Sequence, residues 1–335
     1  MPFKALGFTR IRAAAGRVPD HGPCVEAAGT SNWPCSAKVG PSQSGGMSDA
    51  SPSPERLFWT VFEPIHAISY FHPDFAAAMV GSGLTGWWNG YFAGRAAPLG
   101  RVGAPAVTSL FFVFAPSRVA KAVPEVWRHI DPVKAVETRL ATADEVLSQF
   151  TSDHALPDLR EALTALRRCV DGLDFGGRAL AAAWAGVPPP STLLGQIWLA
   201  ATVLREHRGD GHVIASVENG LTGLQASITH VATGKVQRER IQVTRGWSDE
   251  EWRTAEAELV DRGILDGSGA LTARGAALRD RVEETTDRLA ARSPVLPEDP
   301  SRVIRVLRVL SADIRRHPSF PDANPIGVPH PMAKG

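Results

Sequence analysis

Cysteine is scarce in this chain of 335 residues, where only three occur and two of them fall within the first 54 residues. Neither a disulfide framework nor a cysteine zinc site is therefore indicated. Long apolar runs are also lacking, because none approaches the roughly 20 residues that a membrane-spanning helix needs. The N-terminus has no continuous apolar stretch of the kind that a secretory signal carries. The sequence therefore predicts a cytoplasmic protein that does not contact membranes.

A surplus of one sign of charge is absent as well. The 36 lysine and arginine residues nearly balance 35 aspartate and glutamate residues, which gives a formal net charge of +1 and no overall field that would attract nucleic acid. No P-loop, dinucleotide-binding glycine motif or nucleophile elbow is present. The sequence alone therefore fixes no cofactor, ligand or reaction, and leaves open whether the protein is an enzyme.

Residues 1–54 are rich in glycine, proline, serine and alanine. They are expected to form a disordered extension, because such a segment cannot bury enough apolar surface to offset its ordering entropy. Met47 precedes Ser-Asp-Ala-Ser-Pro-Ser-Pro, which resembles a natural N-terminus. We hypothesise that residues 1–46 are an upstream translation artefact.

Apolar residues after this extension recur mostly at helical spacing, so the predicted fold class is mainly α and multi-helical. Residues 55–188 form a predicted N-terminal helical domain, with a kink or a restart of the helix at Pro64 and a helix over residues 104–114. The proline run at residues 187–190 is the predicted domain boundary. A C-terminal helix and tail occupy residues 296–335.

Residues 191–295 show the order helix, helix, short hairpin, helix that is typical of a winged-helix domain. Residues 235–245 are basic and are expected to be irregular. Ser248 and Glu251 form a capping box, which predicts the start of a helix. Residues 264–272 contain Asp-Gly-Ser-Gly between short apolar runs, which predicts a tight hairpin.

A weak internal sequence similarity, or echo, links the two parts of the chain. Trp88 and Arg95 precede a glycine in much the same way as Trp198 and Arg205 do. The echo indicates either two related halves or a chance similarity.

Ionisable residues concentrate in residues 205–211, which are all polar or glycine and are followed by His212. Gly209 and Gly211 are expected to break the helix there, so that Asp210 caps the next one. One interpretation is the floor of a pocket, where a histidine acts as acid, base or ligand and an arginine binds an anion. The alternative is a helix junction held by arginine–carboxylate pairs.

Glu63 and His66 are three residues apart on a predicted helix and so share a face. This spacing occurs in carboxylate-bridged metal sites, but only one copy is present. A hydrogen-bonded, partly buried pair, metal ligation and contact with an organic ligand are the alternatives. Arg95 lies among aromatic residues and needs an anionic partner, either Glu63 or the carboxylate of a ligand.

Together these features predict a polar pocket between the two helical halves. We expect the Arg95 guanidinium within about 10 Å of a side chain in residues 205–212, a range over which buried charges couple. Glu63, His66 and His212 are the candidates for metal ligation. The candidate ligand-binding residues are Glu63, His66, Trp87, Tyr91, Arg95, Arg205, Glu206, Arg208, Asp210 and His212.

Five motifs together resemble the SalK-like helix-turn-helix family of bacterial proteins. They are Glu63-Pro64-Ile65-His66, residues 91–100, residues 204–212, residues 245–252 and Thr285-Thr286-Asp287. The resemblance covers roughly residues 56–328. It implies an all-helical protein with a winged-helix part, of the transcriptional regulator type. Residues 1–54 lie outside it.

DNA binding is disfavoured by the acidic helix predicted over residues 248–262. Six carboxylates there face only Arg253 and Arg262, so the phosphates of DNA would be repelled. The predicted wing is short and carries no cation. The basic residues 235–245 are the local alternative for a DNA contact.

Three hypotheses for function remain. The first is a small-molecule-binding protein of regulator type, with its ligand in the predicted pocket. The second is an enzyme that uses the same residues for acid–base or metal-assisted chemistry on a small metabolite. The third is a partner-binding structural module, and a homo-oligomer is compatible with each of them.

Overall fold

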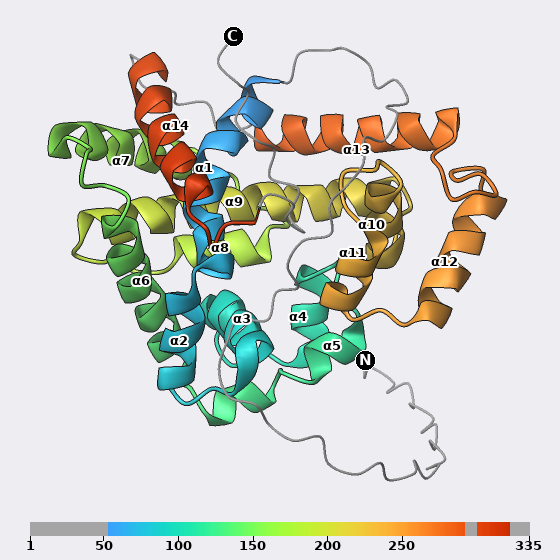
Figure 1. Cartoon of the computed structure of the whole chain (residues 1–335), viewed down its shortest axis with the longest axis horizontal. Helices are drawn as coiled ribbons and strands as arrows, with labels where there is room; N and C mark the ends of the chain where they lie inside the picture. Colours follow the sequence, from blue (N-terminus) through green and yellow to red (C-terminus); the bar gives the residue numbers. More distant parts are fainter. Residues whose placement is uncertain (1–52, 292–299, 322–335) are drawn as a thin grey trace, which may run out of the picture. The chain divides into compact units, whose positions relative to one another are not determined.

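The computed structural model describes residues 53–291 and 300–321, and within them the protein is mainly helical, as predicted (Figure 1). The expectations for residues 1–52, including the translation artefact, lie outside the described residues. Several helices have proline in their first turn, where its missing N–H costs no hydrogen bond. The helices are α1 (Pro54–Phe71), α2 (Pro73–Gly81), α3 (Gly86–Ala96), η1 (Ala97–Leu99), α4 (Ala104–Leu110), α5 (Pro116–Ala120), η2 (Glu125–Arg128), α6 (Pro132–Ser148), α7 (Leu156–Asp171), α8 (Ala179–Ala185), α9 (Leu193–Glu218), α10 (Gly223–Val231), α11 (Arg238–Arg245), α12 (Asp249–Asp261), α13 (Ala273–Ala290) and α14 (Pro300–Arg316).

Helix α9 is the central element, with 26 residues and contacts to α1, α6, α7, α8 and α13 (Figure 1). The predicted break at Gly209 and Gly211 is wrong, because α9 continues through both. A Cβ atom on Gly211 would lie 2.6 Å from Nη1 of Arg178, so this glycine makes room for a side chain that crosses α9. Arg178 donates to the carbonyls of His207 and Leu289, and this packing outweighs the poor helix propensity of glycine.

Three further local predictions can be compared with the structure, and the last two were wrong. Helix α1 does not restart at Pro64 but continues to Phe71, and the neighbours Phe62 and Ile65 are buried in the core. Helix α4 ends at Leu110, and the next residues bond to a distant segment: the Val113 carbonyl accepts from the Trp247 indole. The basic stretch predicted to be irregular contains α11.

Two hydrophobic clusters make up the core. The first contains residues between Val61 and Leu204 together with the buried face of α14, and the second contains residues between Ala215 and Val282. Helix α9 contributes to both clusters. The first cluster includes residues on either side of the predicted boundary at 187–190, and the domain division stays a prediction.

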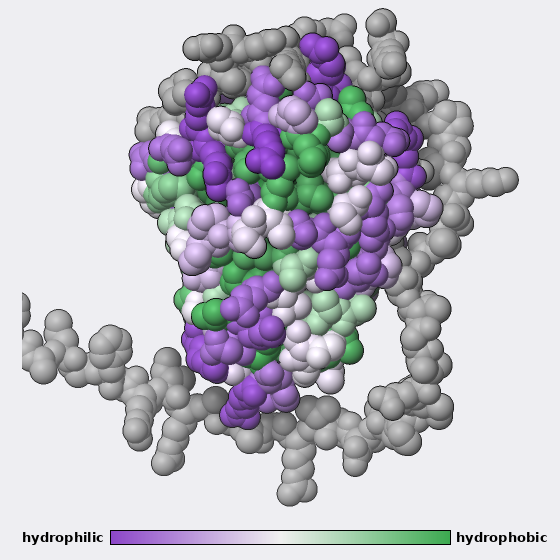
Figure 2. Space-filling model, turned by 90° about the vertical axis from the view of Figure 1, so that its left-hand side faces the viewer, coloured by the Kyte–Doolittle hydropathy of each residue, from purple (hydrophilic) through white to green (hydrophobic). Residues whose placement is uncertain are grey.

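Helix α14 shows how an amphipathic helix completes the first cluster. It packs on α1 and α7, and its residues Val303, Leu307, Leu310 and Ile314 are buried. On the face in Figure 2, hydrophobic side chains are visible between rows of hydrophilic ones. The predicted C-terminal helix is therefore present, with its apolar side inward.

Helices α11 and α12 are joined by a tight turn that begins at Gly246. This glycine has a φ of 82°, in the left-handed region that favours glycine, and a Cβ atom there would lie 2.7 Å from the Arg118 side chain. The predicted capping box of Ser248 and Glu251 begins α12. Instead of a two-stranded hairpin, the chain before α13 has one antiparallel bridge, between Leu265 and Leu271.

Candidate functional site

Arg95 and Glu206 form the contact that joins α3 to the middle of α9. The Arg95 guanidinium donates from Nε to Oε1 of Glu206 at 2.8 Å and from Nη2 to Oε2 at 2.7 Å. Its Nη1 donates to the Tyr91 hydroxyl at 3.2 Å, and the group lies 4.3 Å from the centre of the Phe111 ring. The prediction that Arg95 lies near residues 205–212 is therefore confirmed.

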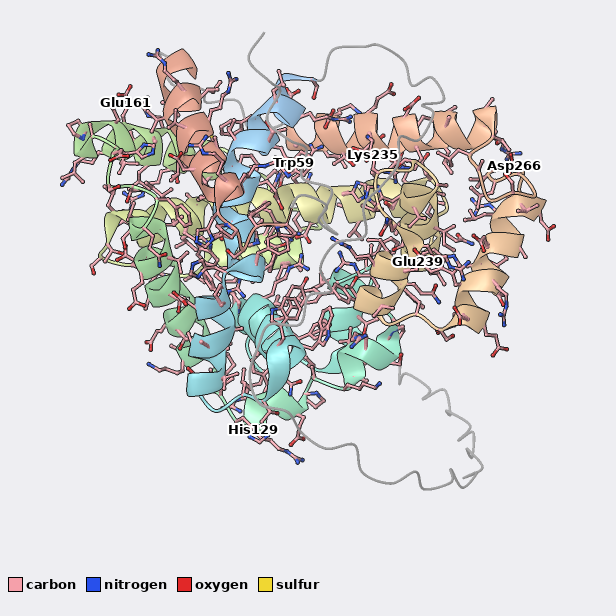
Figure 3. The ribbon with its side chains drawn as sticks, in the orientation of Figure 1. Trp59, His129, Glu161, Lys235, Glu239 and Asp266 are labelled. Atoms are coloured by element: carbon pink, nitrogen blue, oxygen red, sulfur yellow. The ribbon has the colours of Figure 1, made fainter. Side chains whose placement is uncertain are left out.

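Arg205 extends this contact toward α1. Its Nη1 donates to Oε2 of Glu206 at 2.8 Å, and its Nε donates to Oε1 of Glu63 at 3.4 Å. The Trp59 indole donates to the other oxygen of Glu63 at 2.9 Å; Figure 3 labels Trp59 on α1. We call Arg95, Glu206, Arg205 and Glu63 the charge chain.

Electrostatics keep Glu206 ionised within the charge chain. Burial alone would raise the pKa of Glu206, but Arg205 and Arg95 outweigh it and hold the pKa well below its usual range. Burial raises the pKa of Glu63, which has only Arg205 as a charged partner in the described residues. The anionic partner of Arg95 is thus Glu206, and the predicted alternative, Glu63, pairs with Arg205.

His66 is fully buried, and protein groups occupy both of its ring nitrogens. Thr202 uses its hydroxyl hydrogen for the Trp198 carbonyl, so Nδ1 of His66 must donate to Thr202, at 2.8 Å. Nε2 then accepts from the Tyr70 hydroxyl at 2.7 Å. Burial lowers the pKa of His66 well below its usual value, which keeps the ring neutral. His66 thus bonds to Thr202 and Tyr70, and Glu63 bonds to Trp59 and Arg205, instead of forming the pair of Glu63 with His66 that was one predicted alternative.

The remaining predicted residues of α9 contact other helices. Arg208 pairs with Asp287 of α13 at 2.7 Å, and Nδ1 of His212 lies 3.0 Å from the Thr286 hydroxyl. Asp210 caps α8 by accepting from the Ala181 N–H at 3.0 Å, and burial raises its pKa to about 6. The expected cap on a following helix is wrong, because α9 continues.

The described part of the chain has no group of three or more histidine, cysteine, aspartate or glutamate side chains placed to hold a metal ion. Two of the three predicted metal candidates, Glu63 and His66, lie on α1, and His212 lies on α9. Their assignment as ligands stays a prediction.

Arg139 was not among the predicted site residues, although it lies beside two that were. It is 3% exposed on α6 and donates from Nη2 to the Ser69 hydroxyl at 2.9 Å. Its Nε–H is enclosed and has no hydrogen-bond partner within the described residues, and no carboxylate there pairs with it. Its guanidinium lies 5.3 Å from the centre of the Trp198 ring.

A cavity of about 20 Å³ lies beside Arg139. Trp87 and Tyr91, both predicted pocket residues, line it together with Arg139 and Ser69. Burial lowers the pKa of Arg139, yet a guanidinium remains protonated in proteins. The sequence carried a usable signal: Arg139 is a lone cation on the apolar stripe of residues 132–148 that includes Ala135, Val136 and Ala143.

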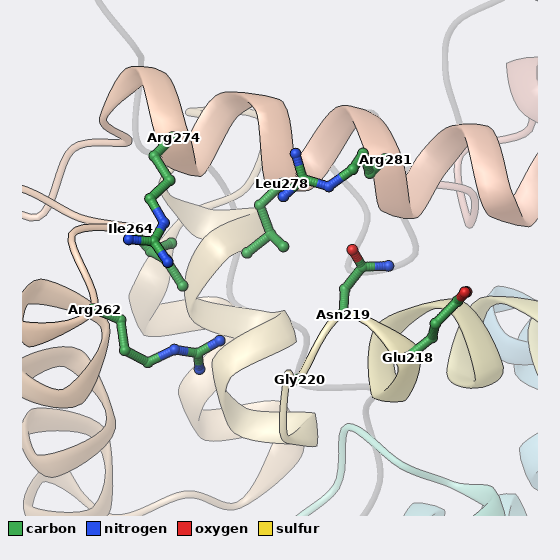
Figure 4. A pocket seen from close by; sticks show the side chains of 8 residues that line it. All are labelled: Glu218, Asn219, Gly220, Arg262, Ile264, Arg274, Leu278 and Arg281. Atoms are coloured by element: carbon green, nitrogen blue, oxygen red, sulfur yellow. The ribbon is translucent and has the colours of Figure 1, made fainter.

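A second cavity lies in the second half of the chain and has a volume of about 380 Å³. Figure 4 shows that α9, α12 and α13 and their ends supply its walls. Nothing in the sequence indicates that these residues share a cavity. They are Glu218, Asn219, Gly220, Arg262, Ile264, Arg274, Leu278 and Arg281.

The basic residues around α11 are largely engaged within the protein. Arg238 lies 3.7 Å from carboxylate oxygens of Asp249 and Glu256, and its guanidinium is 5.1 Å from the centre of the Trp252 ring. Arg245 lies 4.4 Å from the Phe114 ring centre. Figure 3 places Lys235 ahead of α11 and Glu239 on it. This stretch therefore offers few free cations to DNA phosphates.

None of the described helices is both long enough and apolar enough to cross a membrane. Neither the curated proteins nor the solved structures include a significant match to the chain. A sequence model of a helix-turn-helix family matches residues 55–321, which is most of the chain. Of the described residues, only Ser53 and Pro54 lie outside this match. Because this match covers well over half of the chain, the chain belongs to that helix-turn-helix family.

Proposed function

We propose that this helix-turn-helix protein is a cytoplasmic, regulator-type protein that binds a small organic anion at Arg139. The observation that carries the proposal is a buried guanidinium with no carboxylate partner in the described residues, next to a cavity with aromatic walls. We retain within it the SalK-like affiliation and a winged-helix organisation of residues 191–295. The internal repeat and a homo-oligomer also stay proposals.

A buried charge without a partner destabilises the folded protein. Removing a guanidinium from water costs several kcal/mol unless an opposite charge or sufficient hydrogen bonds compensate. Ser69 supplies one hydrogen bond, and the rings of Trp198 and Phe75 supply weaker cation–π contacts. A bound carboxylate would supply the missing charge and accept from the enclosed N–H groups.

The size of the cavity limits what enters without rearrangement. A volume of about 20 Å³ holds little more than one water-sized group. The anionic head of a ligand fits this space, and its remainder must displace a lining side chain. Trp87 is only partly buried and Met79 is flexible, so these two are the side chains that we expect to move.

The charge chain supplies a physical connection from this cavity to the second half of the protein. Tyr91 lines the cavity and accepts from Arg95, which in turn holds Glu206 in the middle of α9. Helix α9 continues into the second hydrophobic cluster, which contains the buried residues of α12. A ligand that moves Tyr91 would therefore act on the helix that both clusters share.

Matched pairs of acid and amide test the proposal. As the concentration of acetate or benzoate rises above its dissociation constant, the melting temperature of the full chain should rise progressively. Acetamide and benzamide, which are similar in shape but uncharged, should not raise it. Arg139→Met should abolish the anion effect, and Arg128→Met, at an exposed arginine, should retain it. Equal shifts with acids and amides, or an undiminished effect in Arg139→Met, would exclude Arg139 as the site.

Under this proposal α12 does not recognise a DNA sequence. A DNA-reading role would require α12 to enter the major groove. It carries six carboxylates and one arginine, Arg253, and its first turn is entirely acidic. The enzyme and partner-binding hypotheses stay hypotheses, since no contact among the described residues favours either one.

A further inference from the structure

The cavity of about 380 Å³ is lined by more cations than the cavity beside Arg139, which contains one arginine. Three arginines line it, Arg262, Arg274 and Arg281, against the single carboxylate of Glu218. Figure 4 shows Arg274 and Arg281 extending from α13 on either side of Leu278, with Arg262 opposite them. Its volume lies within the range of about 300–1,000 Å³ that is usual for small-molecule sites.

The two arginines on α13 have no ion pair or hydrogen bond within the described residues, whereas Arg279 on the same helix pairs with Glu283. Arg262 makes one contact, from Nη1 to the amide oxygen of Gln225 at 3.2 Å. Positions 274, 278 and 281 follow helical spacing and therefore share one face of α13. The pocket thus has a net surplus of positive charge and unused donors.

We propose that this pocket binds a small, multiply charged phosphate compound. Arg274 and Arg281 are seven residues apart, which places their Cα atoms about 10 Å apart along the helix axis. Their long side chains can hold neighbouring phosphate groups, each by the two-pronged geometry that guanidinium groups form with phosphate. A single carboxylate would engage only one of them.

The apolar side of the pocket adds a second element of selectivity. Ile264 and Leu278 are buried and line the pocket between the arginines. They offer a surface for an uncharged part of the ligand, such as a ring. The pocket is concave, so the shape suits a small molecule better than the rounded surface of a DNA duplex. The proposal does not depend on ligand binding at Arg139.

Inorganic pyrophosphate is the probe for this site, titrated into the full chain by calorimetry at fixed ionic strength. We expect saturable binding at one site per chain and weaker binding of monophosphate. Arg274→Gln and Arg281→Gln should each weaken pyrophosphate binding at least tenfold. Arg253→Gln, at an exposed arginine on α12, should leave it within twofold of the wild-type value. Arg139→Met should also leave it unchanged, which separates the two sites.

Three results would overturn the proposal. The first is an absence of saturable pyrophosphate binding to the wild-type chain. The second is wild-type affinity in either Arg274→Gln or Arg281→Gln, or an equal loss in Arg253→Gln, which would indicate diffuse screening. The third is displacement of pyrophosphate by a short DNA duplex, which would make these arginines a contact for a nucleic-acid backbone.

Discussion

Glu206→Ala is expected to lower the free energy of unfolding by about 3–5 kcal/mol, because it leaves the buried Arg95 and the partly buried Arg205 without their shared carboxylate. The loss should appear in urea denaturation of the full chain at pH 7. In this variant Arg95 would keep its hydrogen bond to Tyr91, and Arg205 would keep its contact with Glu63.

Glu218→Ala is the matched control, since Glu218 is an exposed carboxylate near the end of the same helix. It should change stability by no more than about 0.5 kcal/mol. A loss below 1 kcal/mol for Glu206→Ala would show that the charge chain contributes little and that water or rearranged side chains replace the carboxylate.

Arg139→Met is expected to change stability in the opposite direction, raising the free energy of unfolding of the ligand-free protein by about 1–4 kcal/mol. Methionine fills much of the space of the arginine stem, including the room that Gly94 leaves for it, and removes a buried charge that lacks a carboxylate partner. Stability lost through a residue kept for binding is a familiar trade-off at functional sites.

The same substitution at Arg95 is the control. Arg95→Met should destabilise the protein, because it deprives Glu206 of a bidentate partner. Both variants are compared by chemical denaturation after extensive dialysis, so that bound anions do not contribute. If Arg139→Met destabilises the protein as much as Arg95→Met does, Ser69 and the aromatic rings satisfy Arg139 and its role as a ligand site is lost.

Much of the charge chain could be anticipated from the sequence, because charges on an apolar helix must find partners inside the protein. Arg95, Arg205 and Glu206 are recognisable on that ground, and so is their convergence. Their pairing was less predictable, because Glu63 or a ligand was an equally good partner for Arg95. The relative placement of α1, α3 and α9 brings Arg95 to Glu206 instead.

The course of α9 could not be predicted from its own residues. Glycine at positions 209 and 211 ordinarily indicates a helix end, but here Gly211 admits the side chain of Arg178, which comes from more than 30 residues earlier. Arg139 differs, because its position on the apolar stripe of residues 132–148 was a usable signal for burial. The groups that surround it depend on how α6 packs against α1, α2 and α3, which its own helix does not reveal.

We expect this helix-turn-helix protein to work through a bound small anion and not through operator reading by α12. Fluorescence anisotropy of the full chain with a pool of chromosomal duplex fragments at ~150 mM salt, with and without benzoate, distinguishes the two. We predict only the non-specific affinity of about 10⁻⁴–10⁻⁶ M, falling steeply as salt increases. A nanomolar complex with one sequence that resists added salt would contradict the account.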